Sequence, residues 1–316
     1  MLKGKKVLVT GGAGFLGQHL IAQLQEHGVR PEDIFVPRIE EYDLRTQTDA
    51  ERAFAAAKPD IVFHLAAVGG GVTFLKEHPG TVLHDNIVLH TTVIDAARRH
   101  KVQKFVAIGS GLLYPADTPK PLREDTIWDG YPHATTACYG VAARALLSLV
   151  QEYRREFALD AIFLIPSNLY GPGDHFFAPH PHVIPATIRK LDDAHGAPIT
   201  LFGTGEAARE FLYVKDAARA IATAAQEYSS PEPMNLGTGV ATPIREIAAA
   251  IKDALGSTSA IAWDATQPEG ERLRCFDVSR MRDALSYAPH TPLADGLRET
   301  IQWYRAEKAR RAQEAA

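Results

Sequence analysis

Short apolar runs alternate with longer amphipathic stretches along the first half of the chain. Runs of this kind are typical of strands that are buried on both faces of a parallel sheet. The predicted strands lie at 7–9, 34–36, 60–65, 104–108 and 161–164, and the longest predicted helices at 48–57, 79–100 and 139–157. This alternation predicts an α/β fold with a Rossmann-type, doubly wound parallel sheet.

The pattern loosens after residue 165. Residues 166–185 are rich in glycine, proline and histidine, and we expect them to form long functional loops. Shorter helices at 186–193 and 244–255, strands at 199–202 and 260–263, and a terminal helix at 293–312 complete the prediction. We therefore expect a dinucleotide-binding domain over 1–165, to which about 205–240 return, and a smaller C-terminal α/β substrate lobe over 166–316.

The composition fits a globular protein and narrows the range of partners. Hydrophobic residues make up 46% of the chain and charged residues 23%, which are ordinary values. A formal net charge of -4 argues against nucleic acid or an anionic membrane as the main partner. Two cysteines give no disulfide framework, and the chain already reads as a strand at Lys5, which does not resemble a signal peptide. These features predict a cytoplasmic protein, and no metal site is predicted.

A glycine-rich turn follows the first predicted strand. Gly11, Gly14 and Gly17 have the spacing GxxGxxG, and an amphipathic helix begins around Phe15 and Leu16. In dinucleotide-binding folds such glycines permit the turn, the approach of the backbone to a pyrophosphate, and close packing of helix on strand. A tight turn without a ligand has the same pattern, so the motif alone leaves both interpretations open.

Residues after the second and third strands extend the cofactor prediction. The second strand of such folds ends at the adenosine ribose, and Arg38 there favours NADP over NAD because arginine accommodates a 2′-phosphate. An ordinary surface charge is the alternative. Asp43 follows a few residues later. After the third strand, Leu65 leads into Ala66 and Ala67, small residues that let the backbone lie against a ligand.

Taken together, the motifs resemble the extended short-chain dehydrogenase/reductase family, and within it the GDP-L-fucose synthases. Those enzymes epimerise and then reduce GDP-4-keto-6-deoxymannose, so the resemblance implies NADP as cofactor and a GDP-linked nucleotide sugar as substrate. A homodimer is expected. The matching segments are TGGAGFLG at 10–17, HLAAVGGG at 64–71, GSGLLYP at 109–115, PSNLYGPGD at 166–174, HVIP at 182–185, REFLYVKD at 209–216 and NLGTG at 235–239.

The resemblance also implies the catalytic residues. Ser110 and Tyr139 match a hydrogen-bond donor and a proton donor at the reacting ketone, whose oxygen becomes negative as hydride arrives. The family's lysine four residues after the tyrosine is replaced by Ala143. Because the rest of this helix matches, our hypothesis is that Ala143 is an engineered replacement of that lysine rather than a natural degeneration.

A second departure concerns epimerisation. The family's cysteine base is replaced by Leu112, which cannot accept a proton, whereas His182 matches the partner acid. Because that partner base is missing, a loop histidine without a catalytic role is the alternative for His182. Cys138 is the other thiol close to the site in sequence, and we do not expect it to replace the base.

Other matching positions are expected to bind the cofactor or the substrate. Arg209 matches the arginine at the substrate pyrophosphate, a role that suits a guanidinium group, with a surface ion pair to Glu206 or Glu210 as the alternative. Further cofactor contacts are expected at Tyr139, Pro166, Asn168 and Leu169, and further substrate contacts at Ser110, Gly111, Leu112, Asn168, His182 and Arg272. Arg274 falls in the same segment as Arg272, where the family's C-terminal lobe closes over the nucleotide.

These residues favour an NADP-dependent nucleotide-sugar epimerase/reductase. Two alternatives stay open. Leu112 would favour a 4-epimerase or a 4-reductase that does not epimerise the neighbouring carbons. A natural Ala143 would favour a non-catalytic protein that binds nucleotide sugars or NADP.

Overall fold

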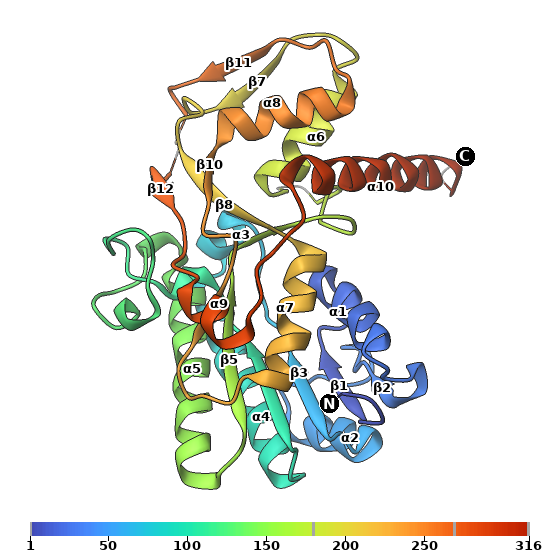
Figure 1. Ribbon diagram of the computed structural model, residues 1–316, viewed down its shortest axis with the longest axis vertical. Helices are drawn as coiled ribbons and strands as arrows, with labels where there is room; N and C mark the ends of the chain where they lie inside the picture. The colour runs from blue at the N-terminus through green and yellow to red at the C-terminus, as the bar shows by residue number, and fades with distance from the viewer. Residues whose placement is uncertain (1, 179–180, 268–269, 315–316) are drawn as a thin grey trace.

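A parallel sheet with the strand order β2-β1-β3-β4-β5-β9 forms the centre of the computed structural model, which describes residues 2–178, 181–267 and 270–314 (Figure 1). The strands are β1 (Val7–Thr10), β2 (Ile34–Phe35), β3 (Ile61–His64), β4 (Lys104–Ile108), β5 (Ala161–Pro166) and β9 (Met234–Leu236). The direction of strand addition reverses beside β1, and such sheets bind ligands at the carboxyl ends of the strands at that reversal. The predicted doubly wound α/β fold is confirmed.

Two groups of helices cover the sheet. Helix α1 packs against α7, and α4 packs between α2 and α5. Every residue of β1 and β3 is buried, so both faces of the sheet must be covered, as the unbroken apolar runs of these strands predict. These helices are α1 (Phe15–Glu26), α2 (Gln47–Ala57), α4 (Pro79–Arg99), α5 (Ala137–Phe157) and α7 (Val214–Glu227), and the short helix α3 (Val72–Glu77) packs at the start of α4.

The chain returns to this sheet late in the sequence. Helix α7 carries buried alanines along its inner face, and these small side chains allow close packing on α1. Strand β9 then pairs in parallel with β5, with Leu164 opposite Met234. Residues 214–236 therefore lie with the elements of the first half of the chain.

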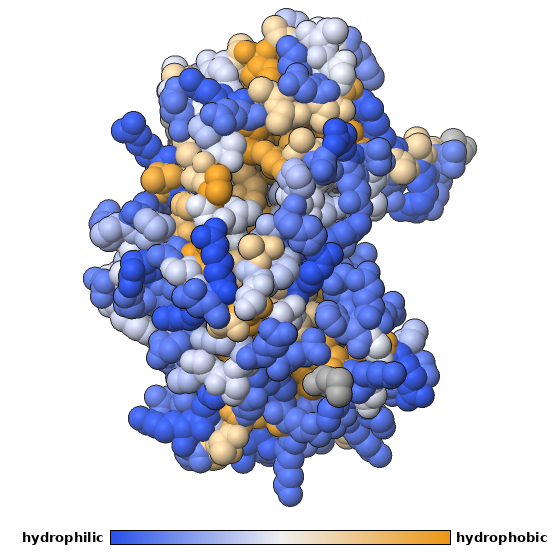
Figure 2. All heavy atoms as spheres, viewed as in Figure 1, coloured by the Kyte–Doolittle hydropathy of each residue, from blue (hydrophilic) through white to orange (hydrophobic). Residues whose placement is uncertain are grey.

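A second apolar cluster forms in the upper part of the molecule in Figure 1. Strands β7 (Ile199–Phe202) and β11 (Ile261–Asp264) pair in parallel, and α6 (Val183–Asp193), α8 (Ile244–Leu255) and α10 (Leu293–Glu314) pack around buried Ile188, Ile251 and Leu297. Helix α6 begins three residues before its predicted start at Ala186, because Pro185 is tolerated in a first helical turn. Figure 2 shows apolar residues gathering in this upper half, whereas hydrophilic residues cover most of the lower half of the same face.

A small sheet lies between the two clusters (Figure 1). Its strands are β6 (Asn168–Tyr170), β8 (Ala208–Tyr213), β10 (Ala241–Pro243) and β12 (Leu273–Arg274), with β8 paired to each of the others. Helix α9 (Ser279–Leu285) and the 3₁₀ turns η1 (Pro31–Asp33), η2 (Gly111–Leu113), η3 (Glu124–Thr126) and η4 (Ala134–Thr136) complete the described elements. Within the described ranges no helix is long and apolar enough to cross a membrane.

Candidate active site

The glycine turn after β1 leaves no room for side chains at two of its positions. Gly11 has a φ of +71°, and a Cβ there would lie 2.9 Å from the nitrogen of Ala66. A Cβ on Gly17 would lie 2.3 Å from the carbonyl oxygen of Gly11. Gly14 is the N-cap of α1, whose first turn begins with residues 15 and 16. Because glycine has no side chain, the N–H groups of this turn receive no side-chain cap from Gly14. These N–H groups suit an anion such as a pyrophosphate.

A buried hydrogen-bond chain supports the loop after β3. The Ala66 N–H donates to Thr10 Oγ1 at 3.2 Å, and Thr10 Oγ1 lies 2.8 Å from His64 Nδ1. His64 Nε2 lies 2.8 Å from His90 Nδ1, and burial lowers the pKa of both histidines. These hydrogen bonds hold the loop at residues 65–67 against the glycine turn. His64 therefore has a structural role at the strand end.

The charged residues after β2 lie at the surface. The Arg38 side chain is 58% exposed, with its Nε 3.7 Å from Glu40 Oε2. Asp43 accepts from the guanidinium of Arg45, which lowers the pKa of Asp43, and Arg45 also reaches Asp85 at 2.6 Å. Arg38 is thus available to an external phosphate, whereas the Asp43 carboxylate is engaged by its own chain.

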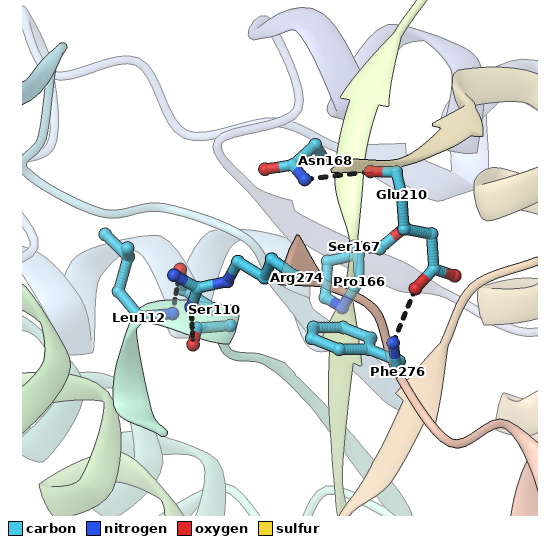
Figure 3. Close-up of a pocket in the computed structure, with 9 residues that line it drawn as sticks. Ser110, Leu112, Pro166, Ser167, Asn168, Glu210, Arg274 and Phe276 are labelled. Atoms are coloured by element: carbon cyan, nitrogen blue, oxygen red, sulfur yellow. Dashed lines mark hydrogen bonds between the residues drawn. The ribbon is translucent and has the colours of Figure 1, made fainter. Parts of the chain in front are cut away.

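A cavity of about 110 Å³ opens at the carboxyl ends of β4 and β5, and both halves of the chain line it (Figure 3). Ser110 caps η2 and its Oγ accepts from the Leu112 N–H at 3.3 Å. Asn168 on the opposite side donates to the Glu210 carbonyl at 2.8 Å. The lining residues are Ser110, Gly111, Leu112, Pro166, Ser167, Asn168, Glu210, Arg274 and Phe276. Leu169 is partly buried against the core beside them.

Helix α5 packs directly onto the segment that carries Ser110. A Cβ on Gly140 would lie 2.4 Å from the Leu112 carbonyl oxygen, so this glycine permits the contact. The preceding residue, Tyr139, has its ring against Gly69, where an added Cβ would lie 2.9 Å from Cε2. Burial raises the pKa of Tyr139, so its hydroxyl is protonated at neutral pH. The two predicted donors to a ketone thus come from adjoining segments.

The lysine position of this helix is apolar. Ala143 is 4% exposed and belongs to the main core. Arg144 points elsewhere, because its Nε donates to the Leu113 carbonyl at 2.7 Å and its guanidinium lies over the Trp128 ring. This position agrees with the helical spacing, which predicts that Arg144 cannot take the place of the missing lysine.

His182 lies apart from the cavity lining but beside a buried carboxylate. It is the N-cap of α6 with its side chain 63% exposed, and its Nδ1 lies 3.9 Å from Asp174 Oδ1. Asp174 is buried, Oδ1 accepts from the His175 N–H at 2.7 Å, and burial raises the pKa of this carboxyl. Among the described residues, Asp174 Oδ2 is buried without a hydrogen-bond partner. The Cys138 thiol donates to the Leu75 carbonyl and is not among the residues that line the cavity.

The arginines of the C-terminal half divide between the cavity and the surface. Arg274 lines the cavity and donates to the Gly111 carbonyl beside Ser110, whereas Arg272 is exposed and outside the lining (Figure 3). Arg209 is half-buried on β8, opposite Arg274 in the strand register. Of the two arginines in this segment, Arg274 lines the cavity, and the contact of Arg272 with the substrate stays a prediction.

The sequence alone does not single out Glu210. It offers this residue only as a surface ion-pair partner of Arg209, whereas in the structure Glu210 is 1% exposed and forms part of the cavity wall. Strand alternation is the signal that points to this, because neighbouring side chains on a strand face opposite sides. Because Arg209 is half-buried on β8, its neighbour Glu210 is expected on the other, more buried side of the strand.

Comparison with known proteins identifies the family. The sequence model of the NAD dependent epimerase/dehydratase family matches residues 7–237. The chain belongs to this family. Among its relatives, "Probable GDP-L-fucose synthase 1" of Oryza sativa subsp. japonica is 35% identical over 96% of this chain and 92% of its own length. GDP-L-fucose synthase of Escherichia coli (strain K12) is 30% identical over 95% of this chain and 96% of its own length.

Solved structures of the family agree with the fold. A GDP-L-fucose synthetase from Naegleria fowleri bound to NADP superposes with a TM-score of 0.88 at 25% identity, covering 97% of this chain and 96% of that chain. A UDP-glucose 4-epimerase from Thermotoga maritima with UDP-glucose has a TM-score of 0.84 at 26% identity over 96% of this chain and 99% of that chain. The predicted resemblance to the extended short-chain dehydrogenases/reductases is confirmed.

Proposed function

We propose that this family member is an NADP-dependent nucleotide-sugar epimerase/reductase that acts on a GDP-linked 4-keto sugar. The observation that carries the proposal is the cavity, which joins Ser110 at the end of β4 with Arg274 from the C-terminal half, beside the helix of Tyr139. The relatives named GDP-L-fucose synthases span nearly the whole chain and support the substrate class.

The residues at the glycine turn fit a dinucleotide. The crowding at Gly11 and Gly17 leaves a cradle that any Cβ would fill, and the first turn of α1 offers its N–H groups to a pyrophosphate. Arg38 is exposed at the end of β2 and supports a preference for a 2′-phosphate, hence for NADP over NAD. When bound, NADP would supply the hydride chemistry at the sugar carbon.

Two hydroxyls of the chain would then act on the ketone oxygen. Ser110 Oγ can donate a hydrogen bond, and Tyr139 can donate a proton, because a tyrosine hydroxyl is protonated at neutral pH and burial raises its pKa further. Ala143 provides no cation to lower the pKa of Tyr139. We therefore expect slow reduction by this chain. His182, beside Asp174, is proposed to move a proton at a carbon next to the ketone.

Arg209 and Arg274 are proposed to bind the diphosphate of the substrate. They lie on paired strands, and a guanidinium can bond two phosphate oxygens at once. Burial lowers the pKa of Arg274, and a diphosphate would supply the negative charge that opposes this effect. Asn168 and Gly111 would line the sugar subsite.

The quaternary structure and location belong to the same proposal. A homodimer is supported by the partly exposed apolar residues on α4 and α5, among them Ile87 at 36% exposure. Light scattering of the purified protein tests this, and a monomer would contradict it. A cytoplasmic location and the lack of a nucleic-acid partner rest on the two cysteines and the net charge of -4.

Binding and turnover together test the proposed function. Calorimetric titration should show binding of NADPH and, independently, tighter binding of GDP than of UDP or dTDP. Incubation of the chain and of Ala143→Lys with GDP-4-keto-6-deoxymannose and NADPH should give reduced GDP-sugar, detected by mass spectrometry. Absence of GDP binding would refute the substrate class. Binding of both ligands without turnover, even with Ala143→Lys, would favour the non-catalytic alternative.

A further inference from the structure

A buried carboxylate holds together the side of the cavity that belongs to the C-terminal half. We call this side the C-terminal wall and define it as Glu210, Arg274 and Phe276 (Figure 3). Glu210 Oε2 accepts from the Phe276 N–H at 2.7 Å. Glu210 Oε1 accepts from the N–H groups of Thr238 at 2.6 Å and Gly239 at 2.9 Å. One side chain therefore joins β8 to two segments that are distant in sequence.

The surroundings of Glu210 are built for a carboxylate. A Cβ on Gly237 would lie 2.0 Å from Glu210 Oε1, so only a glycine leaves room for the charged group. Burial raises the pKa of Glu210, and the backbone N–H bonds oppose that rise. Hydrogen bonds to a buried charged acceptor are stronger than neutral ones, so the three bonds together hold the wall firmly.

The bond to Phe276 acts on Arg274 through a short piece of chain. Strand β12 pairs with β8 only at Leu273 and Arg274, and Glu210 adds its bond to Phe276 immediately beyond that pairing. The opposite edge of this segment pairs with Leu122, whose N–H donates to the Cys275 carbonyl at 2.8 Å. Glu210 thus secures the segment from the side of β8, while Arg274 reaches across the cavity to Gly111.

We propose that Glu210 is a positioning residue that sets the Arg274 guanidinium for the diphosphate of a nucleoside-diphosphate ligand. This inference rests on the proposed function, because it assumes that Arg274 meets that diphosphate. Glu210 itself does not touch the ligand in this role. Its carboxyl oxygens are occupied by three backbone donors, so they are not free to contact the reacting atoms.

A purely structural role for Glu210 makes a different prediction. A loosened fold would weaken GDP and NADPH binding together, whereas a positioning role through Arg274 weakens GDP binding alone. The pyrophosphate of NADP is proposed to bind at the glycine turn after β1, and none of the proposed cofactor contacts belongs to the C-terminal wall. The two roles also differ in a double-mutant cycle, since mutations that act through one residue are not additive.

Glu210→Gln tests the inference by calorimetry. The amide keeps the size of the side chain but replaces one acceptor by a donor, which then faces a backbone N–H. We expect GDP affinity to fall on the order of tenfold, as for one lost charge-assisted hydrogen bond. NADPH affinity should stay unchanged, and on the Arg274→Ala background the same substitution should change GDP affinity by less than about twofold.

Glu206→Gln is the matched control, because Glu206 is exposed on the same chain segment, pairs with Arg245 and does not line the cavity. Glu210→Asp keeps the charge but withdraws it by one methylene, and it serves as the second variant if Glu210→Gln does not fold. An equal loss of GDP affinity with and without Arg274, or a parallel loss of NADPH affinity, would overturn the positioning role. Unchanged GDP affinity in Glu210→Gln would overturn the positioning role and leave the proposed function intact. A parent protein that does not bind GDP would refute the proposed function as well.

Discussion

Restoring a lysine at position 143 is the perturbation that bears most directly on catalysis. Ala143 lies four residues after Tyr139 on α5, and its side chain is buried in the main core. Residues with this spacing lie on the same face of a helix, one turn apart. A lysine there must extend along the helix toward the cavity, where its ammonium would approach the Tyr139 hydroxyl.

The size of the effect depends on the distance between the lysine ammonium and the Tyr139 oxygen. Roughly 6 Å is the outer limit at which a neighbouring charge shifts a pKa strongly. Two unit charges at roughly 6 Å interact by about 2.8 kcal/mol at an effective dielectric constant of about 20. That energy equals about two pKa units. The lysine should therefore lower the pKa of Tyr139, which burial raises in this chain, and make the hydroxyl a better acid.

The expected gain in ketone reduction is on the order of 10²-fold or more, the range in which a tuned general acid acts. The assay follows loss of NADPH absorbance with GDP-4-keto-6-deoxymannose as substrate. Ala143→Met is the matched control, because methionine has a similar length without a charge. The basic limb of the pH–rate profile should also move to lower pH in Ala143→Lys.

An unchanged reduction rate in Ala143→Lys would show that the missing lysine does not limit catalysis. An equal gain in Ala143→Met would show that filling the space near the core, rather than the charge, is responsible. Either result would contradict the hypothesis that Ala143 replaces a catalytic lysine.

Three further predictions concern the cofactor, epimerisation and stability. Arg38→Ala should reduce the preference for NADPH over NADH in a binding titration, while Arg52→Ala should not; tighter binding of NADH by the parent would contradict the role of Arg38. When Ala143→Lys is incubated in D₂O with substrate and NADPH, the product should carry deuterium at no more than one of the two carbons that flank the ketone. Adding Leu112→Cys should restore part of the exchange. Full incorporation at both carbons with Leu112 in place would require another base. The raised pKa of Asp174 means that its contribution to stability is complete below about pH 3.8, the ordinary carboxyl value, and is lost as the pH rises through the raised value. Asp174→Asn cannot ionise, so its melting temperature should rise relative to that of the parent between about pH 4 and about pH 7. A constant difference in melting temperature across that range would show that ionisation of buried Asp174 does not destabilise the parent.

The sequence by itself determined the features that depend on neighbouring residues. The apolar runs of β1, β3, β4 and β5 predict buried parallel strands, because strands covered on both faces need no alternation. The glycine spacing predicts the turn, because glycine favours the positive φ at Gly11 and a Cβ at Gly11 or Gly17 would collide with neighbouring backbone. The helical spacing from Tyr139 also predicts that Arg144 points away from the lysine position.

Only the tertiary structure decided the features that depend on segments far apart in the chain. Arg272 and Arg274 are equivalent as residue types, and only the fold shows that Arg274 lines the cavity whereas Arg272 is exposed outside it. Glu210 becomes a buried anchor because Thr238, Gly239 and Phe276 bring their N–H groups to it. Which side of a strand or loop is buried is set by what packs against it, and local sequence patterns carry little information about that distant partner.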